Sequence, residues 1–274
     1  MSAAGSLAEY PEALMSPSRP PAGFDRRSLL KAAAGTGIAL AGSVVALAAF
    51  PGVAAAYSWP SSLRSGSTGA AVTELQIRIA GWAADGPRQT YVAVDGDFGP
   101  GTEAALKRFQ AANHLTANGI ADADDFAALN ALESSDGSTS HFEFSEFTSS
   151  DGTGFGGGKV GAATVKENVR RLMYKLEALR AKAGNRAITI SSGFRSVAHN
   201  QAIGGASNSM HVYGTAADVY VSGLSTRQVY VLAEACGFSG LERYTLSDAH
   251  QHVDSRIEYA YGSQSWWWES GTVS

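Results

Sequence analysis

Four side chains of types that bind metals lie in two distant segments, and they constrain the fold of this chain most, because three of them can share one ion only if the segments meet. His211 and Asp218 lie seven residues apart, and His250 and His252 follow further along the chain. Two neutral imidazoles and one carboxylate, with a fourth coordination position left open, form the ligand set of a hydrolytic zinc site. A closed structural site more often uses thiolates, and the chain has a single cysteine. The set therefore favours metal-assisted hydrolysis.

The composition is typical of an ordered globular protein. Hydrophobic residues make up 45% of the 274 residues and charged residues 17%, and this length is enough for two modest domains. The net charge of −4, without a basic stripe, argues against a nucleic-acid-binding protein. Cys236 has no second cysteine to pair with and lies in an apolar helical pattern, so we expect a buried and unreactive thiol.

The N-terminal region, residues 1–56, is expected to be disordered at its start and then to direct export. Arg26 and Arg27 precede an uncharged stretch over residues 32–50, and small residues at 54–56 offer a cleavage site. This pattern resembles a twin-arginine signal peptide. The uncharged stretch could instead be an uncleaved membrane anchor, since about 19 residues can span a bilayer. We expect cleavage, a secreted or cell-wall location, and no stable membrane association of the mature protein.

Residues 57–133 are expected to form a small bundle of three helices. Apolar residues recur with helical spacing in two stretches, and a third short helix is predicted over residues 123–132. An Asp- and Gly-rich run over residues 95–101 predicts a tight turn between the first two helices, and Thr102 is expected to cap the second. The periodic residues are Val72, Leu75, Ile79 and Trp82, then Ala105, Phe109 and Ala112.

Several motifs in this region occur in the order found in a known module. They are Leu63-Arg64-Ser65-Gly66-Ser67-Thr68-Gly69, Asp95-Gly96-Asp97-Phe98-Gly99-Pro100-Gly101-Thr102 and Ala105-Leu106-Lys107-Arg108-Phe109-Gln110. Together they resemble the helical peptidoglycan-binding module of many bacterial wall enzymes. The resemblance implies peptidoglycan as a partner. Taken as residues alone, these Gly and Asp side chains could serve only the turns.

A Ser-, Asp- and Gly-rich stretch is predicted to link this bundle to a second domain. Helices and short strands follow one another there, which favours an α+β fold with a small antiparallel sheet. A long helix is expected to begin at a capping box of Thr164 and Glu167. The predicted parts are a linker over residues 134–140, the second domain over 141–258 and a C-terminal tail over 259–274. The predicted strands cover 187–192, 216–221, 240–244 and 251–257, and a further helix covers 225–236.

The positions of the metal-binding residues suit these strands. His250 and His252 are two residues apart, so in a strand their side chains lie on one face. His211 precedes a loop that leads into the strand with Asp218, and Gly214 allows the backbone to turn closely there.

Further motifs run through the second domain in a fixed order. They are Ser192-Gly193-Phe194-Arg195-Ser196, the pattern Ser209-x-His211-x-x-Gly214-x-Ala216-x-Asp218, and His252-Val253-Asp254. In this order they resemble the zinc D-alanyl-D-alanine metallopeptidases, which include carboxypeptidases and endopeptidases of the bacterial wall. The resemblance implies one zinc ion bound by His211, Asp218 and His252. It also implies that Arg195 binds the substrate near the scissile bond.

Arg195 and Ser209 are the candidate substrate-binding residues. Arg195 can fork onto a C-terminal carboxylate or stabilise a developing oxyanion, and its alternative role is a buried structural ion pair. Ser209 can hydrogen-bond the substrate or cap its own loop, and the sequence favours neither. The glycine-rich run over residues 149–159 is expected to be a mobile loop that contributes to the pocket wall.

The general base is the least defined part of the predicted site. Many relatives carry an acidic residue three positions before the last zinc ligand, and here that position is Ala249. Strand alternation favours His250 as general acid/base or oxyanion stabiliser, with Asp248 as the second candidate. Asp254 lies on the same face and can orient a ligand imidazole.

The sequence thus predicts an exported zinc peptidase that hydrolyses peptidoglycan stem peptides, most simply a D-Ala-D-Ala carboxypeptidase acting as a monomer. A cross-link endopeptidase of the same family is the nearest alternative, because Arg195 suits either bond. A non-catalytic peptidoglycan-binding protein is favoured only by Ala249, and a structural or signalling zinc domain is a third alternative. The tryptophan run at 266–268 has no assigned role.

Overall fold

The computed structural model describes residues 57–88, 90–244, 250–259 and 266–270. The predicted twin-arginine signal and Asp248 lie outside these residues. Within them, no helix has both the length and the apolar character needed to cross a membrane.

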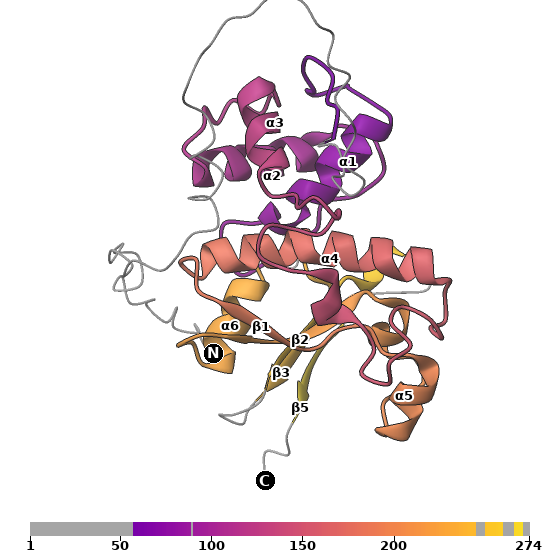
Figure 1. Cartoon of the computed structure of the whole chain (residues 1–274). Helices are drawn as coiled ribbons and strands as arrows, with labels where there is room; N and C mark the ends of the chain where they lie inside the picture. The colour runs from indigo at the N-terminus through magenta and orange to yellow at the C-terminus, as the bar shows by residue number, and fades with distance from the viewer. Residues whose placement is uncertain (1–56, 89, 245–249, 260–265, 271–274) are drawn as a thin grey trace, which may run out of the picture. The chain divides into compact units, whose positions relative to one another are not determined.

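Three α-helices form the first part of the described chain, as the sequence predicts (Figure 1). Their apolar faces enclose a core that includes Leu75 and Phe109, both of which are buried. The third helix begins at a capping box in which Asp122 and Asp125 satisfy each other's backbone amides. The helices are α1 (Ala70–Ile79), α2 (Pro100–Ala112) and α3 (Ala123–Asn130), and a short 3-10 helix, η4 (Ala80–Trp82), follows α1.

The Asp- and Gly-rich loop before α2 is ordered around a buried glutamine. Gln76 Nε2 donates to Asp95 Oδ1 (2.8 Å) and to Thr102 Oγ1 (3.1 Å), and Gln76 Oε1 accepts from the Gly96 amide (2.9 Å). The predicted cap at Thr102 is wrong, because α2 begins after Gly99 without a side-chain cap and the Thr102 hydroxyl bonds Gln76 instead. The polar residues of this motif therefore hold the loop against α1.

Residues 134–140, expected to be a linker, form a turn in the structure. A bridge joins Glu133 to Thr139, and the side chains of Ser138 and Thr139 are buried. The domain boundaries drawn on either side of this turn stay a prediction.

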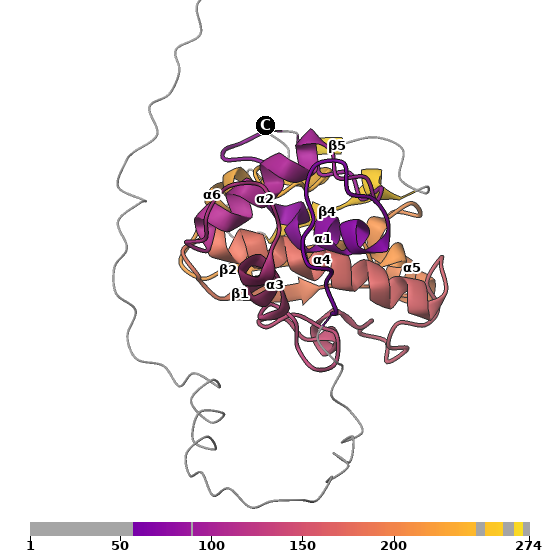
Figure 2. The same ribbon diagram turned by 90° about the horizontal axis from the view of Figure 1, so that it is seen from above.

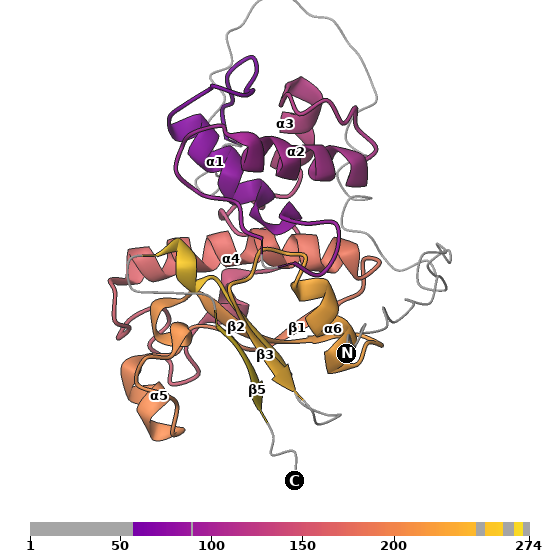
Figure 3. The same ribbon diagram turned by 180° about the vertical axis from the view of Figure 1, so that it is seen from behind.

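The second part of the chain is α+β, which confirms the predicted fold class. Among the described residues its sheet has five strands in the order β1-β2-β4-β3-β5, and Figure 3 shows β5 beside β3. The first four pair antiparallel, as predicted, and β5 adds a parallel strand beside β3. The predicted strand over 251–257 ends at Asp254, and a 3-10 helix, η7 (Arg256–Glu258), follows. The strands are β1 (Ile188–Ser192), β2 (Ala216–Val221), β3 (Gly240–Tyr244), β4 (Gln251–Asp254) and β5 (Trp266–Ser270).

A long helix, α4, packs its apolar stripe into the core of this part of the chain. The predicted capping box is wrong, because the N-cap is Gly161 and makes no side-chain hydrogen bond. Glu167, which we expected to complete the box with Thr164, pairs with two arginines of the next turn. Helices α5 and α6 lie toward opposite ends of α4 (Figures 1 and 2). The bounds are α4 (Ala162–Lys182), α5 (Val197–Ala202) and α6 (Thr226–Ala233).

The glycine-rich run over residues 149–159 follows an aromatic segment over residues 141–147. The run is held by hydrogen bonds rather than forming the mobile loop we expected. Asp151 Oδ2 accepts from Ser196 Oγ (2.5 Å), and the Lys159 amide donates to the Val212 carbonyl (2.9 Å). The run therefore connects the segment after Arg195 with the segment that carries the first candidate zinc ligand.

Candidate metal centre

The candidate ligands come from one short helix and two paired strands. His211 lies on the 3-10 helix η6 (Met210–Tyr213), which ends at Gly214 with a left-handed φ of 75°. A side chain at Gly214 would be strained there and would also meet the Val165 carbonyl at 2.9 Å, so glycine lets the chain turn directly into β2. Asp218 in β2 lies opposite His252 in β4 in the antiparallel register, which sets both side chains on one face.

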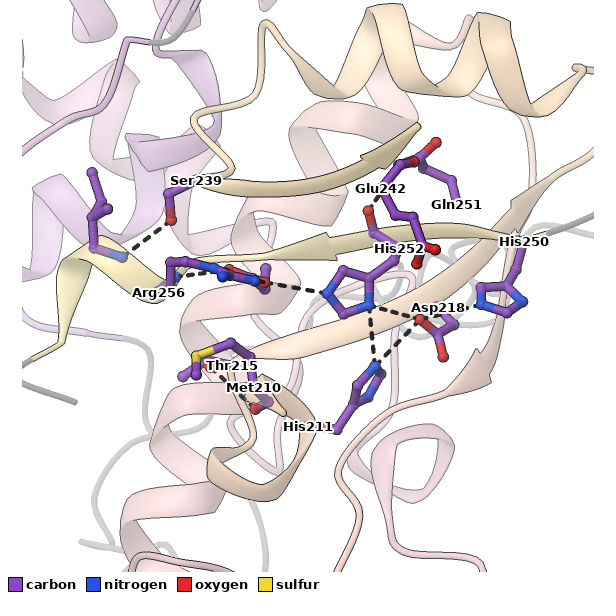
Figure 4. A network of polar contacts seen from close by, with 12 residues as sticks. Met210, His211, Thr215, Asp218, Ser239, Glu242, His250, Gln251, His252 and Arg256 are labelled. Carbon is purple, nitrogen blue, oxygen red and sulfur yellow. Dashed lines mark hydrogen bonds and ion pairs between the residues drawn. The ribbon is translucent and has the colours of Figure 1, made fainter. Parts of the chain in front are cut away.

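The three predicted ligands converge. His252 Nδ1 lies 2.9 Å from Asp218 Oδ1, His211 Nε2 lies 3.3 Å from the same oxygen, and the two imidazole nitrogens are 3.2 Å apart (Figure 4). Zinc–ligand distances of about 2.0–2.2 Å set neighbouring corners of a tetrahedron about 3.3–3.6 Å apart. The observed triangle is close to that spacing, and its donor set of two nitrogens and one oxygen fits zinc.

Outer hydrogen bonds determine which atom of each imidazole faces the centre. His211 Nδ1 donates to the Gly193 carbonyl (2.6 Å), which leaves Nε2 directed at Asp218. His252 Nε2 lies 3.2 Å from Asp254 Oδ2, which leaves Nδ1 as the inward atom. Such carbonyl and carboxylate partners fix tautomer and ring orientation in zinc sites. The predicted orienting role of Asp254 agrees with this contact.

Burial and charge give the three groups different protonation states in the metal-free protein. Burial lowers the pKa of His211 below its ordinary value. Burial alone would also lower the pKa of His252, but hydrogen bonds to Asp218 and Asp254 and the charges of these carboxylates raise it to about 9. Burial would raise the pKa of Asp218, yet the charges of the two imidazoles and their hydrogen bonds hold it below its ordinary range.

Arg195 lies directly beside the centre. Its Nη2 donates to Asp218 Oδ2 (2.6 Å) and its Nε donates to Ser192 Oγ (2.8 Å). The two Asp218 oxygens are thus divided, one toward the imidazoles and one toward the guanidinium. The backbone amide of Arg195 also donates to the His211 carbonyl (3.1 Å), so the predicted substrate-binding motif and the first ligand are joined directly.

The other predicted site residues, His250, Ser209 and Asp248, differ in their distance from the centre and in whether the structure describes them. His250 Nε2 lies 3.5 Å from Asp218 Oδ1, and 34% of the His250 side chain is exposed, so solvent can reach this imidazole. Ser209 precedes η6, is half-buried and makes no side-chain capping bond. Asp248 and Ala249 lie outside the described residues.

One acidic residue near the centre was missed by the sequence reasoning. Glu242 lies on β3, and its carbonyl accepts a hydrogen bond from Gln251 Nε2 (2.8 Å). In the β3–β4 register Leu241 lies opposite Val253, and continuing this register by one residue sets Glu242 opposite His252 and on the same face. Figure 4 shows its side chain beside the imidazole of His252. Strand alternation in β3 was the available sequence signal, but it indicates that Glu242 lies near His252 only once the pairing of β3 with β4 is known.

Comparisons with known proteins match both parts of the chain. A family model described as peptidase M15 matches residues 140–254, and one described as a putative peptidoglycan binding domain matches residues 68–129. The zinc D-Ala-D-Ala carboxypeptidase of Streptomyces albus G is 39% identical over 242 residues, covering 83% of this chain and 92% of that protein. The residues of the candidate centre all lie inside the first matched range.

Proposed function

Because this chain belongs to the peptidase M15 family, we propose that it is a zinc-dependent D-Ala-D-Ala carboxypeptidase acting on peptidoglycan stem peptides. The observation that carries the proposal is the convergence of His211, Asp218 and His252 within a triangle of zinc-ligand size. The peptidoglycan-binding domain supports the wall polymer as partner. The carboxypeptidase assignment follows the name of the Streptomyces albus G relative.

In this proposal His211, Asp218 and His252 hold the zinc ion. Zinc bound there would lower the pKa of a coordinated water to about 7 and polarise the scissile carbonyl. The protein's own contribution is orientation, since the Gly193 carbonyl and Asp254 hold the two imidazoles with the correct nitrogen inward.

Arg195 is proposed to bind the substrate's terminal carboxylate. A guanidinium has five N–H donors, and the two bonds to Asp218 and Ser192 use only part of that set among the described residues. The same group can therefore restrain Asp218 and fork onto a carboxylate. This double role joins the two alternatives left open by the sequence, an ion pair and a substrate contact.

His250 is proposed as the general acid/base. Its Nε2 would take the proton of the attacking water and deliver it to the amine of the departing D-alanine. The contact of 3.5 Å with Asp218 favours an imidazole directed at the centre, and its partial exposure leaves room for substrate. Asp248 stays the second candidate for this role, and Ser209 a candidate hydrogen-bond partner of the peptide.

Export by the twin-arginine route, removal of residues 1–56, release from the membrane and a monomeric state complete the proposal. The export route, the cleavage and the release from the membrane follow from the sequence pattern of the N-terminal region, and none of the four depends on the geometry of the centre.

The substrate bond can be settled with two defined peptidoglycan fragments. Purified mature protein with zinc is incubated with a pentapeptide ending in D-Ala-D-Ala and, separately, with a cross-linked muropeptide dimer. We expect free D-alanine from the first and no split of the second. Split dimers without free D-alanine would identify an endopeptidase, and binding to sacculi without any product would identify a wall-binding protein.

A further inference from the structure

Helix α4 belongs to two hydrophobic cores at once. Its residues Leu172 and Leu176 pack in the core of the peptidase part, whereas Ala178 packs in the core of the three-helix bundle. The described residues accordingly all belong to one compact unit. The two parts that the sequence separates by a linker therefore share a buried helix.

The contact is close enough to require glycine. Gly81 in η4 lies against α4, where an added Cβ would meet the Lys175 Cα at 2.9 Å and would overlap the Ala178 side chain. A second glycine, Gly237 in the peptidase part, also lies against η4, and a Cβ there would meet the Ala80 carbonyl at 2.8 Å. We call the contact of α1 and η4 with α4 and Gly237 the seam. Backbone-to-backbone packing of this kind leaves little freedom for one part to rotate against the other.

Charged groups across the same seam are paired with directional geometry. Arg170 of α4 donates from Nη1 and Nη2 to the two carboxylate oxygens of Glu74 in α1, at 3.0 and 2.9 Å. Glu74 also accepts from Arg78 Nε (2.6 Å), and the guanidinium groups of Arg78 and Arg170 lie 5.4 and 5.7 Å from the Tyr174 ring centroid. The side chains of Glu74 and Arg78 are only 11% and 1% exposed. A forked, largely buried pair specifies orientation as well as proximity.

We propose that Glu74 and Arg170 are positioning residues for the reaction on the wall polymer. They hold the peptidoglycan-binding bundle in one orientation relative to the metal centre, so that a bound wall presents stem peptides at a fixed distance and angle. The inference rests on the proposed function for its substrate. A flexible tether would raise only the local concentration of substrate, whereas a fixed seam also selects which stem peptides reach the centre.

Rotational diffusion tests the fixed seam directly, without reference to activity. Amide 15N relaxation of the zinc-loaded mature protein gives a rotational correlation time for residues 60–130 and another for residues 145–240. A single shared value is expected. Two distinct values, each typical of a small independent domain, would overturn the inference and would leave the proposed peptidase activity untouched.

Paired arginine variants test the consequence for catalysis. Arg170→Ala removes the seam contact, and the matched control Arg171→Ala removes an adjacent arginine that pairs with Glu167 in the same helix. For Arg170→Ala we expect kcat/KM on intact sacculi to fall at least about fivefold while kcat/KM on a soluble pentapeptide stays within about twofold.

The control Arg171→Ala should keep the wild-type kcat/KM both on sacculi and on the soluble pentapeptide. If Arg170→Ala matches Arg171→Ala on sacculi, the positioning role is wrong. If Arg170→Ala loses soluble-peptide turnover as well, its fold is damaged and the relaxation result decides. If the wild-type protein itself releases no D-alanine from the soluble peptide, the proposed function fails and the seam is again judged by relaxation alone.

Discussion

At the scale of single residues, each candidate zinc-binding imidazole has a hydrogen-bond partner that fixes its orientation. Asp254 accepts from His252 and is itself buried and paired with Arg256. Asp254→Asn keeps the shape but removes the negative charge that orients and strengthens the imidazole. We expect the zinc affinity to fall by about 10–100-fold, measured by competition with a chromophoric chelator. Asp124→Asn, an exposed change in α3, is the control, and an unchanged Kd in Asp254→Asn would contradict the orienting role.

The protonation states of the metal-free centre predict how zinc binding depends on pH. The pKa of His252 is raised to about 9, so below that pH the imidazole carries a proton that must leave before zinc can bind. Acid therefore weakens binding and alkali strengthens it. We expect the apparent Kd to fall about tenfold per pH unit between pH 7 and 8 and to level off near pH 9. A Kd that does not change across this interval would contradict a protonated His252.

The proposed base can be separated from the zinc ligands by one substitution. His250→Ala is expected to lower kcat/KM by about 10²–10⁴ and to retain one zinc per chain by elemental analysis. His114→Asn is the control, because His114 is exposed and has a φ of 59° that asparagine tolerates. Full activity of His250→Ala would transfer the role to Asp248 or to Glu242.

The residue types of the centre could be predicted from the sequence, but their mutual contacts could not. Two imidazoles and a carboxylate with this spacing indicate zinc because few other functions need that donor set. Glu242 escaped detection because its proximity to His252 depends on the pairing of β3 with β4. Division of the two Asp218 oxygens between imidazoles and Arg195 likewise depends on side-chain geometry.

At the scale of elements, the close approach of β1's C-terminal end to the aromatic segment holds the first ligand in place. Gly193 accepts from His211 Nδ1, and a Cβ at Gly193 would meet the Phe147 Cα at 2.5 Å. Gly193→Ala forces the backbone at residue 193 or at Phe147 to shift. We therefore expect a loss of about 1–3 kcal/mol in the free energy of unfolding together with weaker zinc binding. Chemical denaturation of the metal-free protein measures the first effect.

The control for this change is Gly101→Ala. Gly101 lies in α2 with no atom within 4 Å of an added Cβ. Alanine should stabilise that helix by about 0.5–1 kcal/mol. If both variants gained stability, the packing argument for Gly193 would be refuted.

Elements with a clear periodicity of apolar residues were predicted correctly, whereas elements determined by tertiary contacts were not. The apolar stripe of α4 and the alternation of the four antiparallel strands specify their own conformations. The start of α4 was misplaced because Thr-x-x-Glu is only a local signal, and Glu167 has stronger partners in two arginines. Strand β5 was not predicted, since its parallel pairing with β3 joins segments without a sequence signature.

At the scale of the whole molecule, the order of motif blocks predicted a wall-binding bundle followed by a zinc peptidase. The seam between them could not be predicted from the sequence, because Glu74 and Arg170 are 96 residues apart and each lies in an otherwise ordinary helical pattern. The turn at 134–140 was interpreted as a linker from its composition. In the structure, the shared helix α4 rather than that turn determines how the parts are held.

A zinc titration of the chelator-treated protein tests the metal centre most directly, with release of free D-alanine from a D-Ala-D-Ala pentapeptide as the readout. We expect no release without metal, a linear rise as zinc is added, and a plateau at one equivalent per chain. For His211→Ala we expect no rise. Undiminished release from protein shown by elemental analysis to be free of metal would contradict a zinc centre at His211, Asp218 and His252.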